Sequence, residues 1–138
     1  MKSIEKIQAE VIKDFEMFEN WIEKYEYLID LGKDLPQIKE QYKTNENLIK
    51  GCQSRVWLYA KKKDGKIIYT ADSDAIITKG IISLLVYILS NQKSEDILNS
   101  NLIFIDKIGL KEQLSPTRAN GLVSMIKQMK LYALAFKK

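Results

Sequence analysis

The sequence predicts one α+β domain over residues 1–138, in which a small antiparallel sheet of about three strands has helices packed on one of its faces. Three observations carry this prediction. Apolar residues recur at helical steps of three and four near both ends of the chain. In the middle they alternate with polar residues around an Asp-Gly pair. No repeat, low-complexity stretch or linker divides the 138 residues, a length typical of one domain.

The N-terminal segment is expected to be helical, either as one helix or as two helices broken near Asn20. Ser3 is a suitable N-cap, and Gly32 followed by Pro36 marks the end of the segment. Pro36 is expected to open a short helical turn that reaches Tyr42. The apolar stripe of the segment consists of Ile4, Ile7, Val11, Phe15, Phe18, Ile22, Tyr25, Leu28 and Ile29.

A β-hairpin is expected next. Residues 55–61 alternate between two faces, the Asp64-Gly65 pair is a strong hairpin turn, and residues 67–70 form the return strand. Leu48 and Ile49 are a candidate third strand.

A buried helix is expected over residues 75–89, with Ser73 or Asp74 as its cap, because apolar residues fall all round it. Gly80 lies inside this helix at a cost of about 1 kcal/mol relative to alanine, which predicts close approach by another backbone.

The last third of the chain is expected to be mainly helical. Ser94 can cap a short helix, residues 102–108 fit either a strand or a helix, and the Ser115-Pro116 pair begins the final helix. Met125 and Met129 are expected to fill the core.

Two counts exclude whole classes of function. The chain has no His, which excludes a Ser-His-Asp triad, a Cys-His pair and His-ligated metals. It has one Cys, which excludes an internal disulfide, a zinc ribbon and a cysteine-ligated iron–sulfur cluster within one chain. A glycine-rich phosphate loop is absent as well. No cofactor and no metal are therefore expected.

Charge and hydropathy indicate neither nucleic acid nor membrane as a partner. Residues 1–50 carry 8 Lys/Arg and 11 Asp/Glu, and residues 51–138 carry 14 and 7, but the lysines of the basic part are scattered and accompany no recognition motif. The longest apolar run, residues 81–89, is far shorter than a membrane span, and the first 20 residues contain no secretory apolar region. A cytoplasmic protein with a reduced thiol is expected.

Cys52 is the first candidate for chemistry. A lone Cys is usually a small buried hydrophobe, but Gly51, Gln53 and Ser54 around this one are loop formers directly before a strand. The flanking cations, Lys50 and Arg55, are expected to lower the pKa of the thiol and favour the nucleophilic thiolate.

Two further motifs remain. Arg118 is at the third position of the final helix, where the helix dipole disfavours a cation, so it is a candidate to bind an anion, a thiolate or a partner's carboxylate. Gly121 predicts close backbone approach. The pair Asp72 and Asp74 could suggest a metal, but helix capping is the preferred interpretation because a Ca²⁺ site needs more ligands.

In their order and spacing these motifs resemble the SufE family of sulfur acceptor proteins, over about residues 15–135. The segments that carry the resemblance are Gly51-Cys52-Gln53-Ser54 with Val56-Trp57-Leu58, Asp72-Ser73-Asp74-Ala75 with Lys79-Gly80, and Leu114-Ser115-Pro116-Thr117-Arg118 with Asn120-Gly121-Leu122.

The resemblance implies the fold of the IscU-type scaffold, and a role. Cys52 would accept sulfur from the persulfide of a pyridoxal-phosphate cysteine desulfurase, SufS or a relative, stimulate that enzyme, and relay the sulfur to the SufBCD scaffold of iron–sulfur cluster assembly. The chain would be an accessory protein rather than a stand-alone enzyme, as a monomer or a homodimer. Arg118 and Asp74 would lie beside the cysteine loop, and Gly51, Gln53, Ser54 and Arg55 would meet the partner.

The sequence departs from the family pattern at two positions and leaves alternatives open. Gln113 stands where members often have His, and Arg55 where Gln is common. The alternatives are a CsdE-like acceptor for another desulfurase, a thiol-dependent redox enzyme using Cys52, a nucleic-acid-binding module and a nonreactive adaptor.

Overall fold

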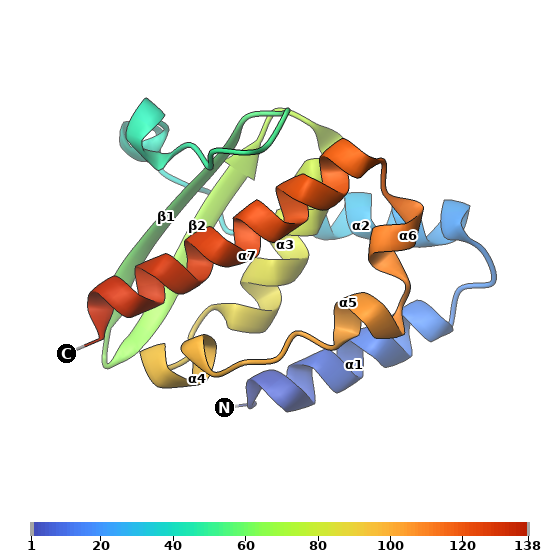
Figure 1. Ribbon diagram of the computed structural model, residues 1–138, viewed down its shortest axis with the longest axis horizontal. Coiled ribbons are helices and arrows are strands. Elements are labelled where there is room, and N and C mark those ends of the chain that lie inside the picture. The colour runs from blue at the N-terminus through green and yellow to red at the C-terminus, as the bar shows by residue number, and fades with distance from the viewer. Residues whose placement is uncertain (1, 138) are drawn as a thin grey trace.

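The α+β architecture is confirmed by a computed structural model that describes residues 2–137. Two strands form one antiparallel sheet, and helices lie along one face of it (Figure 1). The elements are α1 (Ile4–Glu16), α2 (Trp21–Lys33), η1 (Glu40–Tyr42), η2 (Asn45–Asn47), β1 (Val56–Lys63), β2 (Lys66–Ser73), α3 (Ile76–Leu89), α4 (Ser94–Leu98), α5 (Phe104–Lys107), α6 (Leu110–Gln113) and α7 (Pro116–Phe136).

The hairpin is longer than predicted and has no third strand among residues 2–137. Its register pairs Val56 with Ser73 and Lys63 with Lys66, around a turn in which Asp64 and Gly65 have positive φ. Leu48 makes only an isolated bridge to Trp57, because the chain leaves the sheet immediately afterwards to form the Cys52 loop.

The two faces of the hairpin have different environments. The inner face is buried against α3 and α7, which cover it from the same side (Figure 1). The outer face carries the η1 segment, where the ring of Tyr42 stacks on that of Tyr59 at 3.8 Å. The prediction of helices on one face is therefore confirmed.

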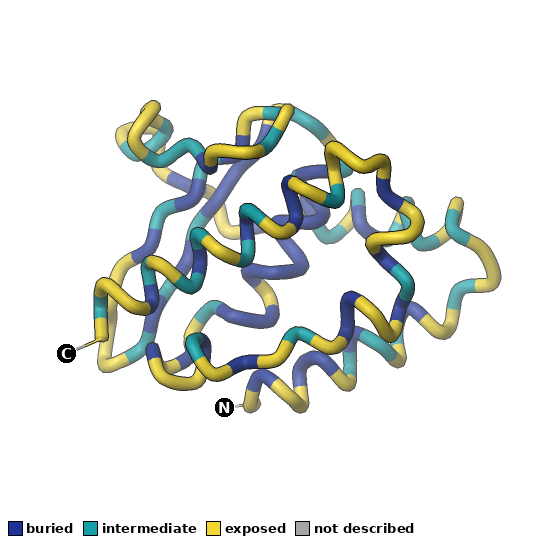
Figure 2. Tube along the Cα trace, in the orientation of Figure 1, coloured by how far each residue is buried: buried dark blue, intermediate teal, exposed yellow. Residues whose placement is uncertain are grey.

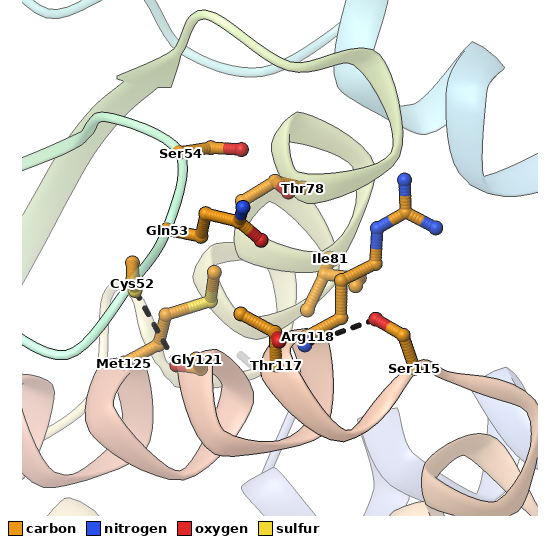
Figure 3. A pocket seen from close by; sticks show the side chains of 10 residues that line it. All are labelled: Cys52, Gln53, Ser54, Thr78, Ile81, Ser115, Thr117, Arg118, Gly121 and Met125. Carbon is orange, nitrogen blue, oxygen red and sulfur yellow. Dashed lines mark hydrogen bonds between the residues drawn. The ribbon is translucent and has the colours of Figure 1, made fainter.

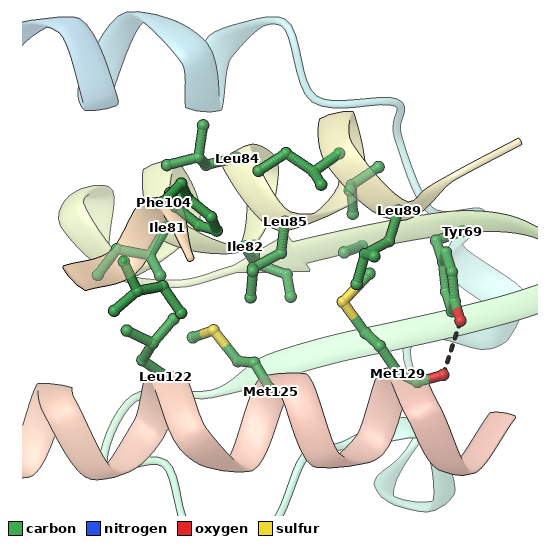
Figure 4. Close-up of a cluster of buried hydrophobic side chains, with 14 of the residues drawn as sticks. Tyr69, Ile81, Ile82, Leu84, Leu85, Leu89, Phe104, Leu122, Met125 and Met129 are labelled. Carbon is green, nitrogen blue, oxygen red and sulfur yellow. Dashed lines mark hydrogen bonds between the residues drawn. The ribbon is translucent and has the colours of Figure 1, made fainter. Parts of the chain in front are cut away.

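Helix α3 is the centre of the core, as its all-round apolar pattern predicted. Figure 4 shows its buried side chains between the hairpin, α5 and α7, with Met125 and Met129 filling the space from α7. The buried Tyr69 satisfies its hydroxyl by donating to the Met129 carbonyl at 2.6 Å (Figure 4).

The close approach predicted at Gly80 is confirmed, and the neighbour is α2. A Cβ atom at Gly80 would overlap the backbone carbonyl of Leu28, and one at Gly32 would lie 3.2 Å from the Gly80 nitrogen. The predicted end of the segment near Gly32 is confirmed to within one residue, and Gly32 itself lies inside α2. The helix ends one residue later, at Lys33, with Asp34 as its C-cap.

Helices begin at the predicted N-cap residues where the capping side chain has no competing hydrogen-bond partner. Ser3 and Ser115 accept from backbone N–H groups of α1 and α7, and Asn20 caps a separate α2, so the N-terminal segment forms two helices. The prediction that Ser73 or Asp74 caps α3 is wrong, because both side chains bond to Arg55 instead and Ala75 is at the N-cap.

Two further expectations are settled in the last third of the chain. Ser94 is the first residue of α4 rather than its cap, and its buried hydroxyl has no partner among the described residues. The ambiguous stretch 102–108 contains the helix α5. Across residues 2–137, no helix combines the length and apolar character needed to cross a bilayer.

Candidate functional site

Cys52 lies on a loop between η2 and β1 that passes over the first turns of α7 (Figure 1). Buried Ile49 anchors the start of this loop by donating its N–H to the Val56 carbonyl at 2.8 Å. Between these two residues the loop is mostly exposed or half-buried.

Gly51 is required where the loop touches α7. Its φ of +93° lies in the left-handed region, which side chains disfavour, and a Cβ atom there would overlap the Ser124 hydroxyl. The residue before Cys52 is therefore one that only glycine suits, at a point where the loop contacts the helix.

The Cys52 thiol rests against the backbone of α7. Its Sγ atom is 3.7 Å from the carbonyl oxygen of Gly121, and a Cβ atom on Gly121 would lie 3.4 Å from that sulfur (Figure 3). A close approach at Gly121 is therefore found, but the approaching group is the Cys52 side chain rather than the backbone that was predicted.

An open cleft of about 280 Å³ borders the thiol. It brings together side chains from the loop, from α3 and from the start of α7 (Figure 3). The lining residues are Cys52, Gln53, Ser54, Thr78, Ile81, Ser115, Thr117, Arg118, Gly121 and Met125. The sequence motifs around Cys52 and Arg118, more than sixty positions apart, thus share one cleft.

Arg118 lines this cleft but is not directed at the sulfur. Its backbone N–H is capped by Ser115 Oγ at 3.3 Å, while its exposed guanidinium extends away from Cys52 toward α2 (Figure 3). Within residues 2–137 it makes no ion pair. The head group is available to an anion that enters from solvent.

Asp74 fixes the end of the cysteine loop. Its Oδ1 atom accepts from the Arg55 N–H at 3.0 Å, and its own N–H donates to the Arg55 carbonyl at 3.2 Å. Ser73 donates its hydroxyl to the same carbonyl at 2.8 Å. These three bonds hold Arg55 at the start of β1, so Asp74 lies beside the loop but outside the cleft lining.

Burial raises the pKa of the Cys52 thiol above its ordinary value. The expectation that Lys50 and Arg55 lower this pKa is therefore wrong for the resting structure. Half-burial against α7 disfavours the thiolate, and both flanking cations are exposed, where water screens their charge.

The raised pKa predicts how Cys52 responds to pH. Alkylation by iodoacetamide should reach its half-maximal rate at a higher pH in the native protein than in the chain unfolded in urea, since only the thiolate reacts. A mass-spectrometric time course at a series of pH values measures both. A native midpoint below that of the unfolded chain would show that the cations dominate.

Asp72 belongs to a different cluster from the one its spacing suggested. It lies in β2, where Lys43 is 2.7 Å and Lys79 is 3.2 Å from its carboxylate. Burial alone would raise its pKa, but Lys43, the Ser73 N–H and Lys79 together hold that pKa below its ordinary value. It therefore does not cap α3, and no three potential metal-binding side chains gather anywhere in residues 2–137.

Sequence reasoning missed the cleft residues that the core helices supply. Thr78, Ile81 and Met125 occupy positions that the helical pattern assigns to the core, and nothing in the pattern shows that one end of the core opens at the cleft. The polar Thr78 among the apolar residues of α3 is a signal that could have been followed.

Comparisons with known proteins agree on one family. The family model described as "SufE: Fe-S metabolism associated domain" matches residues 9–133. An uncharacterized SufE-like protein of Rhizobium meliloti is 38% identical over 126 residues, which cover 88% of this chain and 90% of the relative. The SufE-like protein 1, chloroplastic/mitochondrial, of Arabidopsis thaliana is 40% identical over 126 residues, which cover 91% of this chain but only 34% of that longer protein.

The fold is shared more widely than the sequence. The solution structure of a hypothetical protein from Thermus thermophilus superposes with a TM-score of 0.78 at 18% identity, and the match covers 94% of each chain.

Proposed function

Because the chain belongs to the SufE family, we propose that Cys52 accepts the terminal sulfur of a persulfide on a SufS-type cysteine desulfurase and relays it to the SufBCD scaffold. Family membership supports the coarser role of sulfur acceptor. The observation that carries the finer proposal is the lone thiol on a loop beside an open cleft.

The first transfer needs no redox partner. The Cys52 thiolate attacks the outer sulfur of the desulfurase persulfide, a new S–S bond forms to Cys52, and the S–S bond within the desulfurase persulfide breaks. The desulfurase cysteine leaves as a thiolate, so one S–S bond replaces another and no oxidant or reductant is consumed. The product on this chain is the Cys52 persulfide.

We propose that docking of the desulfurase moves the loop outward and thereby activates the thiol. The chain contains no His that could act as a base, and burial disfavours the thiolate at rest. Movement about Gly51 would return the thiol to water and remove that penalty. In the resting position the cleft wall would shelter a reactive persulfide from oxidation.

Arg118 and Arg55 are proposed to meet the partner. Both are exposed, at the cleft rim and at the end of the loop respectively. A guanidinium with free donors suits a carboxylate of the docking enzyme. Gln53 and Ser54, between Cys52 and Arg55, would contact the same surface.

Asp74 provides a test of loop movement. Replacing Asp74 with alanine removes the acceptor for the Arg55 N–H, so the loop should open more often and Cys52 should be alkylated about fivefold faster. Asp74→Asn is the matched control, because its amide oxygen can still accept that bond and the rate should stay near wild type. Equal rates for the two variants would contradict the proposal that Asp74 restrains the loop.

Intact-mass spectrometry tests the function directly. The protein is incubated with a SufS-type desulfurase and cysteine, and then with SufBCD. We expect a gain of one sulfur atom, removable by reductant, followed by its loss to the scaffold. A gain only with another desulfurase would assign a CsdE-like pathway, and no gain with any active desulfurase would overturn the proposal.

A reducing compartment such as the cytoplasm fits this chemistry. The acceptor cysteine must stay free between transfers, and Cys52 has no partner cysteine in the chain.

A further inference from the structure

The floor of the thiol cleft is apolar except for one hydroxyl. Four of the lining residues are buried, namely Thr78, Ile81, Gly121 and Met125, and they are called the cleft floor below. Ile81 and Met125 are apolar and Gly121 has no side chain, so Thr78 supplies the side-chain hydrogen-bond donor of the floor. The other polar lining residues are exposed or half-buried at the rim.

The Thr78 hydroxyl has no acceptor within residues 2–137. The nearby serines, Ser73 and Ser83, each donate to a backbone carbonyl of another segment, but Thr78 does not. Thr78 is nevertheless only 6% exposed. Figure 3 shows it on the side of α3 that faces the cysteine loop, with no hydrogen bond to another lining residue. Because a buried hydroxyl without a partner is costly and rare, this free donor favours a ligand that enters the cleft and accepts a hydrogen bond.

The acceptor that the proposed function brings to this cleft is the outer sulfur of the Cys52 persulfide. The Cys52 Sγ atom borders the floor at Gly121, and the outer sulfur would lie about 2 Å beyond Sγ. Persulfides are more acidic than thiols, so this sulfur is an anion at neutral pH. The Gly121 carbonyl oxygen, 3.7 Å from Sγ, repels an anion, so the outer sulfur should turn away from it and into the cleft.

We propose that Thr78 binds the outer sulfur of the Cys52 persulfide by donating its hydroxyl hydrogen to that sulfur. This inference rests on the proposed function and adds a sulfur-binding residue on α3. The apolar side chains of Ile81 and Met125 would cover the bound sulfur. In such surroundings a hydrogen bond to an anion is stronger than in water, so one hydroxyl can hold the sulfur in the floor while the loop is at rest.

The charged groups around the cleft do not fill this role. Arg118 lines the rim, but its guanidinium is directed away from Cys52 (Figure 3). The other charged side chains near the cleft are Lys50 and Arg55 on the loop, both exposed, Asp74, which bonds to the Arg55 backbone, and Lys79 of α3, which pairs with Asp72. None of them is altered in the variants below, so a changed response to pH can be assigned to the Thr78 hydroxyl.

Two variants of Thr78 test the inference. Thr78→Val removes the hydroxyl and keeps the shape of the side chain, whereas Thr78→Ser keeps the hydroxyl. Each protein is loaded by the desulfurase and cysteine, and a parallel sample is loaded by inorganic polysulfide. In the second reaction the Cys52 thiolate attacks the terminal sulfur of the polysulfide, one S–S bond replaces another, and a polysulfide shorter by one sulfur atom leaves.

The readout is the pH at which alkylation of the persulfide by iodoacetamide reaches half its maximal rate, followed by intact mass on protein that has gained one sulfur atom. We expect this pH to be about one unit higher in Thr78→Val than in wild type, the effect of losing one hydrogen bond to an anion. Thr78→Ser should stay near wild type. Equal values for wild type and Thr78→Val would overturn the inference.

The unloaded protein and its stability show whether Thr78 has only a structural role. Thr78 is proposed to reach the outer sulfur and not Sγ, so alkylation of the Cys52 thiol should have the same pH midpoint in all three proteins. A shift there as large as that of the persulfide would contradict the inference, because Thr78 would then act through the loop. Thr78→Val should also unfold at no lower temperature than wild type, and a lower Tm would count against a free hydroxyl.

The proposed function fails at a different step of the same experiment. Wild type that gains no sulfur from any active desulfurase overturns the proposed function, while the samples loaded by polysulfide still test Thr78. Wild type that is loaded by the desulfurase, but whose persulfide has the same pH midpoint as that of Thr78→Val, overturns the inference alone.

Discussion

Replacing Cys52 with serine is expected to abolish sulfur acceptance completely. Serine keeps the shape of the side chain beside Gly121, but its hydroxyl cannot form the S–S bond on which transfer depends. Intact-mass spectrometry after incubation with desulfurase and cysteine should show the mass gain in wild type and none in the variant. Stimulation of desulfurase turnover should disappear with it.

Folding and docking serve as controls for this variant. Cys52 is half-buried against the core and its thiol makes one weak hydrogen bond, to the Gly121 carbonyl, so the free energy of unfolding of Cys52→Ser should differ from that of wild type by less than about 1 kcal/mol. Binding to the desulfurase should persist because the loop and cleft rim are unchanged. If a folded Cys52→Ser protein still accepted sulfur, the proposal that Cys52 is the acceptor would be overturned.

The largest expected effect on stability is at Gly80. A Cβ atom at this position overlaps the backbone carbonyl of Leu28, so Gly80→Ala must push α2 and α3 apart. The gain in helix propensity, about 1 kcal/mol, does not offset the overpacking. We expect a net loss of about 2–3 kcal/mol in the free energy of unfolding, measured by urea denaturation, and a Tm lower by roughly 10 °C.

Gly121→Ala is the matched control, since it makes the same change inside another helix. The three atoms nearest to its added Cβ all belong to Cys52, and the closest, the sulfur, lies at 3.4 Å, an ordinary van der Waals distance. Stability should therefore stay within about 1 kcal/mol of wild type. Comparable losses at the two glycines would show that helix contact at Leu28 is not the cause.

Much of the fold was predictable because its signals are local. The caps Ser3 and Ser115, the Asp64-Gly65 turn and the all-round apolar pattern of α3 act within a few residues, where steric and hydrogen-bonding preferences dominate. Gly80 was informative for a similar reason. Glycine lowers the stability of a helix, so its presence inside α3 indicates a contact that compensates for this cost.

The errors occur where a distant partner competes for a local group. Asp74 and Ser73 have the side chains of helix caps, but the Arg55 backbone across the hairpin takes their hydrogen bonds. Sequence order cannot reveal such competition, because the competing group is far along the chain.

The functional site also has some features that the sequence predicts and others that only the structure shows. The sequence alone identified Cys52, its loop formers, Arg118 and Gly121 as candidates, since one thiol, a cation against a helix dipole and a helical glycine are each chemically unusual. Only the tertiary structure decided that they meet in one cleft, that the thiol rests on Gly121, and that burial raises the Cys52 pKa. The physical reason is that burial and close contact arise from segments that fold together across the chain, whereas residue chemistry is carried by each position itself.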